Sequence, residues 1–421
     1  MRERWWLIFM LCSTLACSRE HKDLFTTRDA GTPDAALGEA RGEARAPENE
    51  NRVSVALPVP APGRWLEIMP GGKTLCSRGS PYRFFVRGGR TDRVIVDFEG
   101  GGACWNKLTC SVSGSLFRDE ARTLESFMNS IAKGEFGGIY DPEPGRAFAD
   151  WTLIHIPYCT GDIHWGDAAA DYGDGLNIEH RGFVNASAAL DWMYAHYPAP
   201  QNVFVAGCSA GAYGAALHSA YVARHYSNAR VTMLADSGAG IITDSFLKDS
   251  LPNWNAMRAL PSFIPALTRP LEDLHLPDLY EAISAAFPKH RFAQTATQFD
   301  DDQIFFYTAM GGNPADWPGM YGASLARGEQ SSANVRSYVP PGSMHCALPY
   351  PFFYTREVNG VKLADWTEQL VLGDDPPASV ACEGDGCCHD AVCDACKGIT
   401  ESPCKFCKNW PPEWSSCKKA N

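Results

Sequence analysis

The pentapeptide 207–211, Gly-Cys-Ser-Ala-Gly, places a serine where a hydrolase nucleophile would stand. It directly follows the apolar run 203–206 and opens the alanine-rich stretch 210–226, which predicts a turn from a strand into a helix. Such a turn strains the serine backbone, and the small flanking residues let strand and helix approach closely. We therefore predict that Ser209 attacks a carbonyl carbon, although the motif alone also occurs by chance.

A run of glycines upstream of this motif supplies the second part of an acyl-transfer site. The strand-like segment 93–98 ends in Glu99 and the glycines 100–102. Acyl transfer develops negative charge on the carbonyl oxygen, and backbone N–H groups aimed at that oxygen stabilise it. Many esterases use glycines at this place for the purpose. We predict an oxyanion hole formed by the N–H groups of Gly101, Gly102 and Ala210; the alternative is a flexible turn.

A histidine base is expected after the nucleophile, because triads of this fold class run in the order serine, acid, histidine. The histidines beyond the serine are His218, His225, His275, His290, His345 and His389. Of these, His345 follows a strand-like segment, 335–339, through a short loop. A histidine in such a loop can reach over the serine and act as general base and then general acid. We therefore predict His345 as the base.

The acid of the triad has two candidates. Asp300 opens an acidic cluster, 300–302, after a strand-like segment, and Asp236 ends the strand that follows the nucleophile helix. Strand order favours the cluster, because the acid usually follows the next strand along. The cluster is equally compatible with a solvated turn.

The length and composition of the chain fit one large α/β domain with a small appendage, since 45% of its 421 residues are hydrophobic. Residues 1–17 carry charges followed by an apolar run that is too short to span a bilayer, as in an export signal. The segment ends in Thr-Leu-Ala-Cys, which resembles a bacterial lipobox, so we predict lipidation at Cys17 rather than ordinary cleavage nearby. Residues 18–61 lack apolar periodicity, which predicts a solvated tether. The catalytic domain is then 62–375.

The C-terminal segment 376–421 is rich in cysteine. Removing Cys12 and Cys17 from the sixteen cysteines leaves an even number, which suits export to an oxidising compartment. The two C-x-x-C pairs of the tail, 393–396 and 404–407, have the spacing of a zinc ribbon. In an exported chain we favour a disulfide-stapled appendage, with no metal site and no cofactor.

Several motifs in this order resemble the pectin acetylesterase and Notum family of α/β-hydrolases. They are EGGGACWN, YCTGDIHWGD, GCSAGAYG, LADSGAG, QFDDDQI and the loop ending SMHC, which together span about 65–373. The resemblance implies an α/β-hydrolase-like fold, with a mostly parallel central sheet flanked by helices. By the family's aromatic-Asp-x-x-Gln-aliphatic pattern, it selects Asp300 as the acid and leaves Asp236 as the rival. It also implies disulfides between Cys76 and Cys159 and between Cys104 and Cys110.

Four further residues are candidates for lining the site, namely Trp105, Asp162, His164 and Trp165. For the two polar ones, a structural role is the alternative. The segment 246–290, rich in Leu, Pro and aromatic residues, is either a lid or pocket wall or a packed helical insertion.

Asp and Glu outnumber Lys and Arg by 49 to 37, and this excess argues against a nucleic-acid partner. It also weakens attraction to a polyanion such as pectin. We predict an exported serine esterase whose substrate is an O-acetylated polysaccharide or another ester, with membrane contact only through the N-terminal lipid. A lipase or protein deacylase and a non-catalytic carbohydrate-binding lipoprotein are the alternatives.

Overall fold

The computed structural model describes residues 59–112 and 116–388. The chain divides into two units, Met1–Ala56 and Leu57–Asn421, and every described residue belongs to the second. The export signal, Cys17, nearly all of the tether and the C-x-x-C pairs of the tail lie outside the described residues, so those predictions stay predictions. No helix in the described part of the chain combines the length and the apolar character that crossing a membrane requires.

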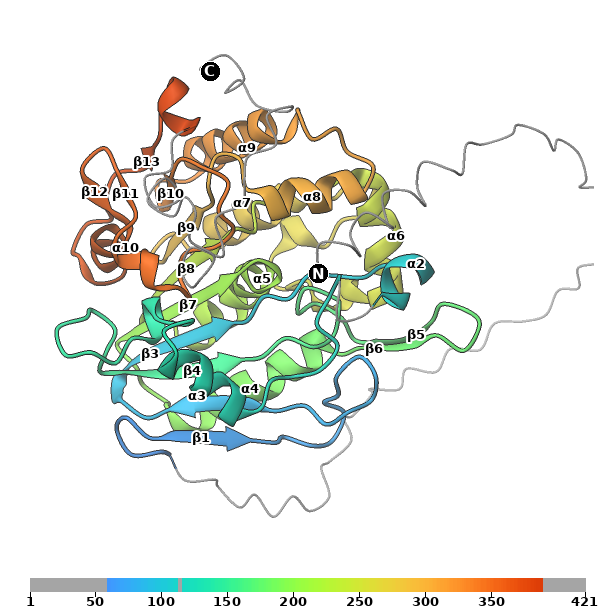
Figure 1. The fold of residues 1–421 in the computed structure, drawn as a ribbon, viewed down its shortest axis with the longest axis horizontal. Helices are drawn as coiled ribbons and strands as arrows, with labels where there is room; N and C mark the ends of the chain where they lie inside the picture. Colours follow the sequence, from blue (N-terminus) through green and yellow to red (C-terminus); the bar gives the residue numbers. More distant parts are fainter. Residues whose placement is uncertain (1–58, 113–115, 389–421) are drawn as a thin grey trace, which may run out of the picture. The chain divides into compact units, whose positions relative to one another are not determined.

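A mostly parallel β-sheet forms the centre of the second unit (Figure 1). Its first two strands, β1 and β2, are antiparallel to each other, β2 is antiparallel to β4, and all subsequent neighbours are parallel. In order across the sheet the described strands are β1 (Trp65–Ile68), β2 (Phe84–Arg87), β4 (Trp151–Ile156), β3 (Arg90–Phe98), β7 (Asn202–Cys208), β8 (Arg230–Asp236), β9 (Arg291–Thr295), β10 (Val335–Val339) and β13 (Val380–Ala381).

Helices and two short hairpins complete the described elements. The α-helices are α2 (Lys107–Ser111), α3 (Leu124–Ala132), α4 (Gly182–His196), α5 (Ala210–His225), α6 (Asp244–Trp254), α7 (Leu276–Ala286), α8 (Asp301–Ala309), α9 (Trp317–Ser331) and α10 (Leu363–Leu372). The 3-10 turns are η1 (Gly138–Tyr140), η2 (Ala256–Ala259), η3 (Pro265–Leu267), η4 (Leu271–Asp273), η5 (Pro351–Tyr354) and η6 (Gly384–Cys388). The hairpins are β5 (Ala168–Asp171) with β6 (Asn177–His180), and β11 (Glu357–Val358) with β12 (Val361–Lys362).

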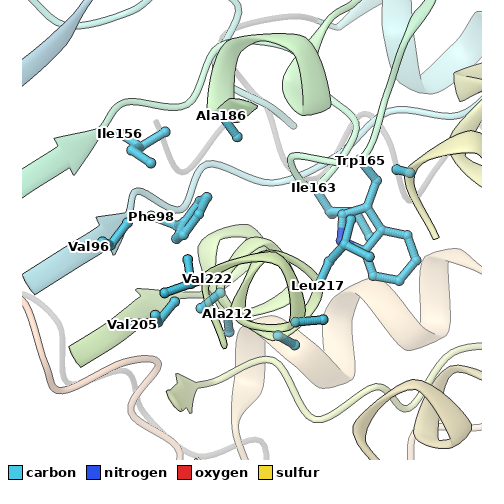
Figure 2. Packing of buried hydrophobic residues seen from close by; sticks show 14 of the residues in the cluster. Val96, Phe98, Ile156, Ile163, Trp165, Ala186, Val205, Ala212, Leu217 and Val222 are labelled. Carbon is cyan, nitrogen blue, oxygen red and sulfur yellow. The ribbon is translucent and has the colours of Figure 1, made fainter. Parts of the chain in front are cut away.

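The sheet is covered by helices on both faces because its strands are apolar on both sides. Along β3, Val94, Val96 and Phe98 pack into the cluster that includes α4, α5 and α7, whereas Ile95 packs into the opposite cluster with α3 and α10. Successive strand residues point to opposite faces, so a fully buried strand needs an apolar run rather than alternation. Figure 2 shows Val96 and Phe98 beside Val205 of β7 and Val222 of α5.

This architecture confirms the predicted fold class. The apolar runs 93–98, 203–206 and 335–339 lie in β3, β7 and β10, and the alanine-rich stretch forms α5. The domain boundary predicted at residue 375 falls inside the packed unit, because β13 extends the main sheet beside β10. The Gly342 N–H also donates to the Cys387 carbonyl at 2.9 Å, so the chain continues to pack past that boundary.

The segment 246–290 is a packed helical insertion that also contributes to a pocket wall. Leu251, Trp254 and Ile283 are buried in the core cluster, as the packed-insertion alternative requires. Phe246 and Leu276 belong to the same cluster and also line the pocket described below. The two readings that the sequence left open are therefore both partly right.

Candidate active site

The turn between β7 and α5 holds Ser209 in a strained backbone conformation, with φ 59° and ψ −125°. The two motif glycines make the turn possible: a Cβ at Gly207 would lie 2.2 Å from the Gly211 carbonyl oxygen, and one at Gly211 would lie 1.9 Å from the Phe98 carbonyl oxygen. The Ser209 N–H donates to the Asp236 carbonyl at 2.8 Å. Non-glycine residues with positive φ are uncommon and gather at functional sites, so this geometry is that of a nucleophile turn.

The glycine run after β3 packs directly against this turn. A Cβ at Gly100 would lie 2.4 Å from the Cys208 carbonyl oxygen, so only glycine fits there. Gly102 has φ 77° and, together with Ala103 and Ala210, lines the same pocket as Ser209. Gly101 is not among the described residues that line this pocket; its carbonyl accepts a hydrogen bond from the Arg118 N–H at 2.8 Å.

Glu99 anchors the start of the glycine run. Its buried carboxylate accepts hydrogen bonds from the Arg122 guanidinium at 2.7 Å and the Tyr158 N–H at 3.1 Å, and it pairs with Arg118 at 3.3 Å. Burial alone would raise the pKa of Glu99, but the cations nearby, Arg118 first, outweigh burial and lower it. The carboxylate therefore stays ionised and fixes the loop in place.

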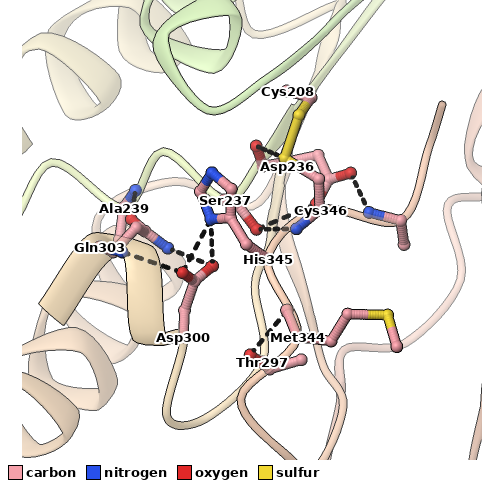
Figure 3. Close-up of polar contacts among 11 residues, drawn as sticks. Cys208, Asp236, Ser237, Ala239, Thr297, Asp300, Gln303, Met344, His345 and Cys346 are labelled. Carbon is pink, nitrogen blue, oxygen red and sulfur yellow. Dashed lines mark hydrogen bonds and ion pairs between the residues drawn. A yellow bond between two sulfur atoms is a disulfide. The ribbon is translucent and has the colours of Figure 1, made fainter. Parts of the chain in front are cut away.

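His345 and Asp300 form a hydrogen-bonded pair at the ends of β10 and β9 (Figure 3). The His345 Nδ1 atom lies 2.8 Å from Asp300 Oδ1 and 3.0 Å from Oδ2. Asp300 is the N-cap of α8 and accepts further hydrogen bonds from the Gln303 N–H and the Gln303 Nε2 group, both at 3.0 Å. Because Nδ1–H donates to the carboxylate, Nε2 of His345 is left as the proton acceptor.

The acidic cluster raises the pKa of His345 to about 9. Burial of the imidazole by itself lowers the pKa, but the charge of Asp300, then that of Asp302, and the hydrogen bond to Asp300 outweigh it. An imidazolium formed during a reaction is therefore strongly stabilised at this position.

Asp236, the alternative acid, contacts the backbone beyond His345. Its buried carboxylate accepts hydrogen bonds from the Ala347 N–H at 2.6 Å and the Leu348 N–H at 2.8 Å. Burial raises its pKa to about 6. The structure therefore brings Asp300 to the histidine ring and uses Asp236 to hold the loop that carries this ring.

The four residues predicted as possible site-lining groups are placed behind the pocket wall. Trp105 is buried against Phe246, and the Trp165 Nε1 group donates to the Tyr213 carbonyl at 2.9 Å. Asp162 accepts from the Gly182 N–H at 2.8 Å, and His164 Nε2 lies 2.9 Å from the Glu99 carbonyl oxygen. Burial raises the pKa of Asp162 to about 6 and lowers that of His164 to about 4. Among the described residues, none of these four lines the pocket.

The pocket that contains Ser209 and His345 has mainly apolar walls and a volume of about 550 Å³, its open mouth included. Phe246 and Leu276 in its wall belong to the segment 246–290 that was predicted as a possible pocket wall. Sequence reasoning missed the wall residues Ile163, Tyr213, Ile241, Ile242, Gln303, Phe306 and Met310. The sequence did contain one indication of this wall. Gln303, Phe306 and Met310 follow Asp300 at helical spacing, so they lie on the same face of a helix. Of the remaining wall residues, Tyr213 lies on α5. Ile163, Ile241 and Ile242 lie in loops, whose positions no local pattern indicates.

Four disulfides lie in the described part of the chain. The bonds Cys76–Cys159 and Cys104–Cys110, which the family resemblance implies, are present. The sequence did not predict Cys208–Cys346 or Cys382–Cys387. Cys104, Cys110 and His180 gather closely enough to suggest a metal site, but the two sulfur atoms are bonded to each other and are not thiolates.

The sheet and nucleophile turn define an α/β protein of the hydrolase type. The solved structure of the Wnt deacylase Notum from Drosophila shares this fold, with a TM-score of 0.51 and 15% identity over 73% of this chain and 95% of that one.

Residues 69–250 match the family model described as Pectinacetylesterase. Pectin acetylesterase 11 of Arabidopsis thaliana is 28% identical over 42% of this chain and 45% of its own length. The inactive palmitoleoyl-protein carboxylesterase notum1b of Danio rerio is 29% identical over 24% of this chain and 72% of its own length. The chain spans less than half the length of the curated plant relatives it matches. These matches confirm the resemblance to the pectin acetylesterase and Notum family.

Proposed function

We propose that this protein is a serine carboxylic-ester hydrolase that works through an acyl-enzyme. The observation that carries the proposal is the joint presence, in one pocket, of a serine in a strained turn and a histidine hydrogen-bonded to a buried carboxylate. Family resemblance adds support, since the family model and the matching plant relatives are named as pectin acetylesterases.

In the proposed mechanism, Ser209 Oγ attacks the ester carbonyl while His345 Nε2 accepts its proton. Asp300 keeps the imidazole in the tautomer that leaves Nε2 free to accept, and it stabilises the imidazolium that forms. Of the three N–H groups predicted for the oxyanion hole, those of Gly102 and Ala210 stabilise the oxyanion, because these two residues line the pocket with Ser209 and Gly101 does not. His345 then protonates the departing alkoxide, and a water molecule, activated by the same histidine, hydrolyses the acyl-enzyme.

For the substrate, we favour an O-acetylated polysaccharide such as pectin, in line with the names of the plant relatives. A specific observation supports the second candidate, a lipase or protein deacylase. The pocket wall carries Phe246, Leu276, Phe306 and Met310, which are apolar side chains of the kind that contact a hydrocarbon chain. A series of p-nitrophenyl esters from acetate to dodecanoate separates the two, because kcat/KM rises with chain length only if the acyl chain fills this pocket.

We also propose that the protein is exported and, more specifically, that Cys17 is lipidated. The described disulfides support export, since such bonds form and persist in oxidising compartments.

The decisive experiment treats the purified protein with a fluorophosphonate and measures the adduct by mass, beside Ser209→Ala. We expect labelling of the wild type alone, with the thermal unfolding of the two proteins nearly the same. Equal labelling of both proteins contradicts the assignment of Ser209. If the folded wild type is not labelled, the remaining alternative is the non-catalytic carbohydrate-binding lipoprotein.

A further inference from the structure

One disulfide joins the two chain segments that carry the proposed nucleophile and base. Cys208 directly precedes Ser209, Cys346 directly follows His345, and their sulfur atoms are bonded across a sequence separation of 138 residues (Figure 3). The bond therefore links the backbone at Ser209 to the backbone at His345 through one residue on each side.

The topology of the sheet explains why these two segments need a link. Ser209 follows β7 and His345 follows β10, and β8 and β9 lie between those strands. Neighbouring strands are about 4.8 Å apart, so the loop after β10 must cross roughly 14 Å of sheet edge to reach the serine. Residues 340–350 contain no helix or strand, so this crossing is held by individual contacts. Among them are the hydrogen bonds that the Phe299 and Asp301 N–H groups donate to the carbonyls of Gly342 and Ser343, both at 3.1 Å.

The backbone at the crossing is held in an unfavourable conformation. Cys346 has φ 64°, and Ser237, directly after β8, has φ 58°. Both values lie in the left-handed region that L-residues rarely adopt. Such conformations persist only where surrounding contacts determine them. Here the contacts are the disulfide, the hydrogen bond from the Cys346 N–H to Ser237 Oγ at 2.9 Å, and the Asp236 carboxylate on the next two backbone N–H groups.

We propose that Cys208–Cys346 is a positioning cross-link that keeps His345 within reach of Ser209, beyond any contribution to global stability. This inference rests on the proposed esterase function. The acyl-binding wall, for example Phe246, Leu276 and Phe306, belongs to other elements, so loosening the cross-link disturbs proton transfer and leaves substrate binding intact. The disulfide thus affects kcat far more than KM.

The test compares the double variant Cys208→Ala/Cys346→Ala with the control Cys76→Ala/Cys159→Ala. The control bond also spans a long stretch, 83 residues, and its cysteines are fully buried, but it joins the loop before β2 to the end of β4 and touches neither proposed catalytic residue. We expect kcat of the first variant to fall about 100-fold, the loss typical of a misplacement of about 1 Å, with KM within about twofold of the wild type. The control should lose melting temperature and keep its kcat.

The pH dependence of kcat/KM gives a second test, because the loss of a bond with a purely structural role would leave it unchanged. If His345 drifts from Asp300 when the cross-link is absent, the acid limb of kcat/KM shifts to lower pH, because the carboxylate no longer stabilises the imidazolium. An unchanged limb, together with a kcat loss no greater than that of the control, overturns the positioning role.

Should the double variant fail to fold, the folded wild type is treated with a water-soluble phosphine. Each opened disulfide takes up two electrons and two protons to become two thiols, while the phosphine becomes its oxide with an oxygen atom from water. Cys208 is partly exposed, whereas Cys76 and Cys159 are buried, and iodoacetamide with mass analysis identifies the opened bond. Fluorophosphonate labelling that slows as Cys208 is alkylated supports the proposal, and an unchanged rate overturns it. Absence of labelling in untreated wild type overturns the proposed function as well.

Discussion

Among the described residues, two buried carboxylates are each hydrogen-bonded to a histidine ring, and only one of these two pairs lines the pocket of Ser209. In the pair at the candidate active site, His345 Nδ1 lies 2.8 Å from Asp300 and the histidine side chain is 17% exposed. In the second pair, His155 Nδ1 lies 2.6 Å from Asp97 and the histidine side chain is 1% exposed. The hydrogen bond and the buried carboxylate are common to both, so neither feature by itself makes a site.

The surroundings of the second imidazole nitrogen separate the two pairs. Nε2 of His155 is buried without a hydrogen-bond partner in the described part of the chain, and the ring stacks on Phe127 with centroids 4.3 Å apart. Asp97 also accepts a hydrogen bond from Tyr140 Oη at 2.6 Å. His345, in contrast, lines a pocket together with Ser209. The comparison teaches that access of Nε2 to a nucleophile and to solvent decides whether such a pair can do chemistry.

The largest expected effect comes from removing the histidine that lines the pocket. We expect His345→Ala to lower kcat by about a millionfold, because proton transfer from Ser209 then has no base, while thermal unfolding changes little. Ester turnover and a melting curve test this. The control is His225→Ala, an exposed histidine at the end of α5 that stacks on Tyr194 and should keep wild-type turnover. A His345→Ala protein that retains substantial turnover would mean that another group is the base.

The carboxylates provide the next test. We expect Asp300→Asn to lower kcat by about 10⁴-fold, because the amide no longer holds Nδ1–H of His345 as a carboxylate does and the wrong tautomer becomes available. Asp97→Asn, the corresponding change in the other pair, should leave kcat unchanged in whatever protein remains folded. Equal losses in the two variants would remove the distinction between the pairs.

For the buried pair the expected effect is on stability. His155→Phe leaves the buried Asp97 without its imidazole partner, so we expect the free energy of unfolding to fall by about 3–5 kcal/mol with kcat retained. Urea denaturation measures this. Replacing both partners, as in Asp97→Leu/His155→Phe, should recover much of the loss, and a double variant as unstable as the single one would count against the explanation.

The smallest expected effect concerns the charge around His345. Asp302→Asn removes one of the negative charges that raise the pKa of His345, so this pKa falls and more of the base is neutral at pH 7. The acid limb of kcat/KM should therefore move to lower pH, with a gain of about threefold at neutral pH, as expected for a shift of roughly half a pH unit. Glu357→Gln, an exposed acid on β11, is the control. A shift to higher pH would show that Asp302 acts through packing rather than charge.

Much of the fold followed from local pattern. The apolar runs that form β3, β7 and β10 and the alanine-rich stretch that forms α5 are visible in the sequence because each satisfies its own periodicity. His345 was predicted as the base from chain order and from the strand-like segment before it. The prediction of Asp300 as the acid depended on the family pattern as well. Strand order alone left Asp236 in contention, since Asp236 ends β8 and Asp300 follows the next strand of the same sheet, β9.

The sequence did not predict which side chains point into the pocket. The four residues predicted to line the site are buried behind the pocket wall, namely Trp105, Asp162, His164 and Trp165. Ile163, which lies between Asp162 and His164, lines the pocket. The backbone of Ile163 and His164 is left-handed, with φ 53° and 65°, and this sets the direction of the side chains in that segment. The residue types there do not indicate such a conformation.

The sequence by itself determined the elements and the order of the chemical groups, because periodicity and turn residues act within a few positions of the chain. Tertiary structure alone decided that Asp236 holds the loop beyond His345, that Trp105 and Trp165 lie behind the pocket wall, and that Cys208 pairs with Cys346. Each of these depends on segments that are far apart in sequence and that the fold brings together, and no local interaction encodes such a contact.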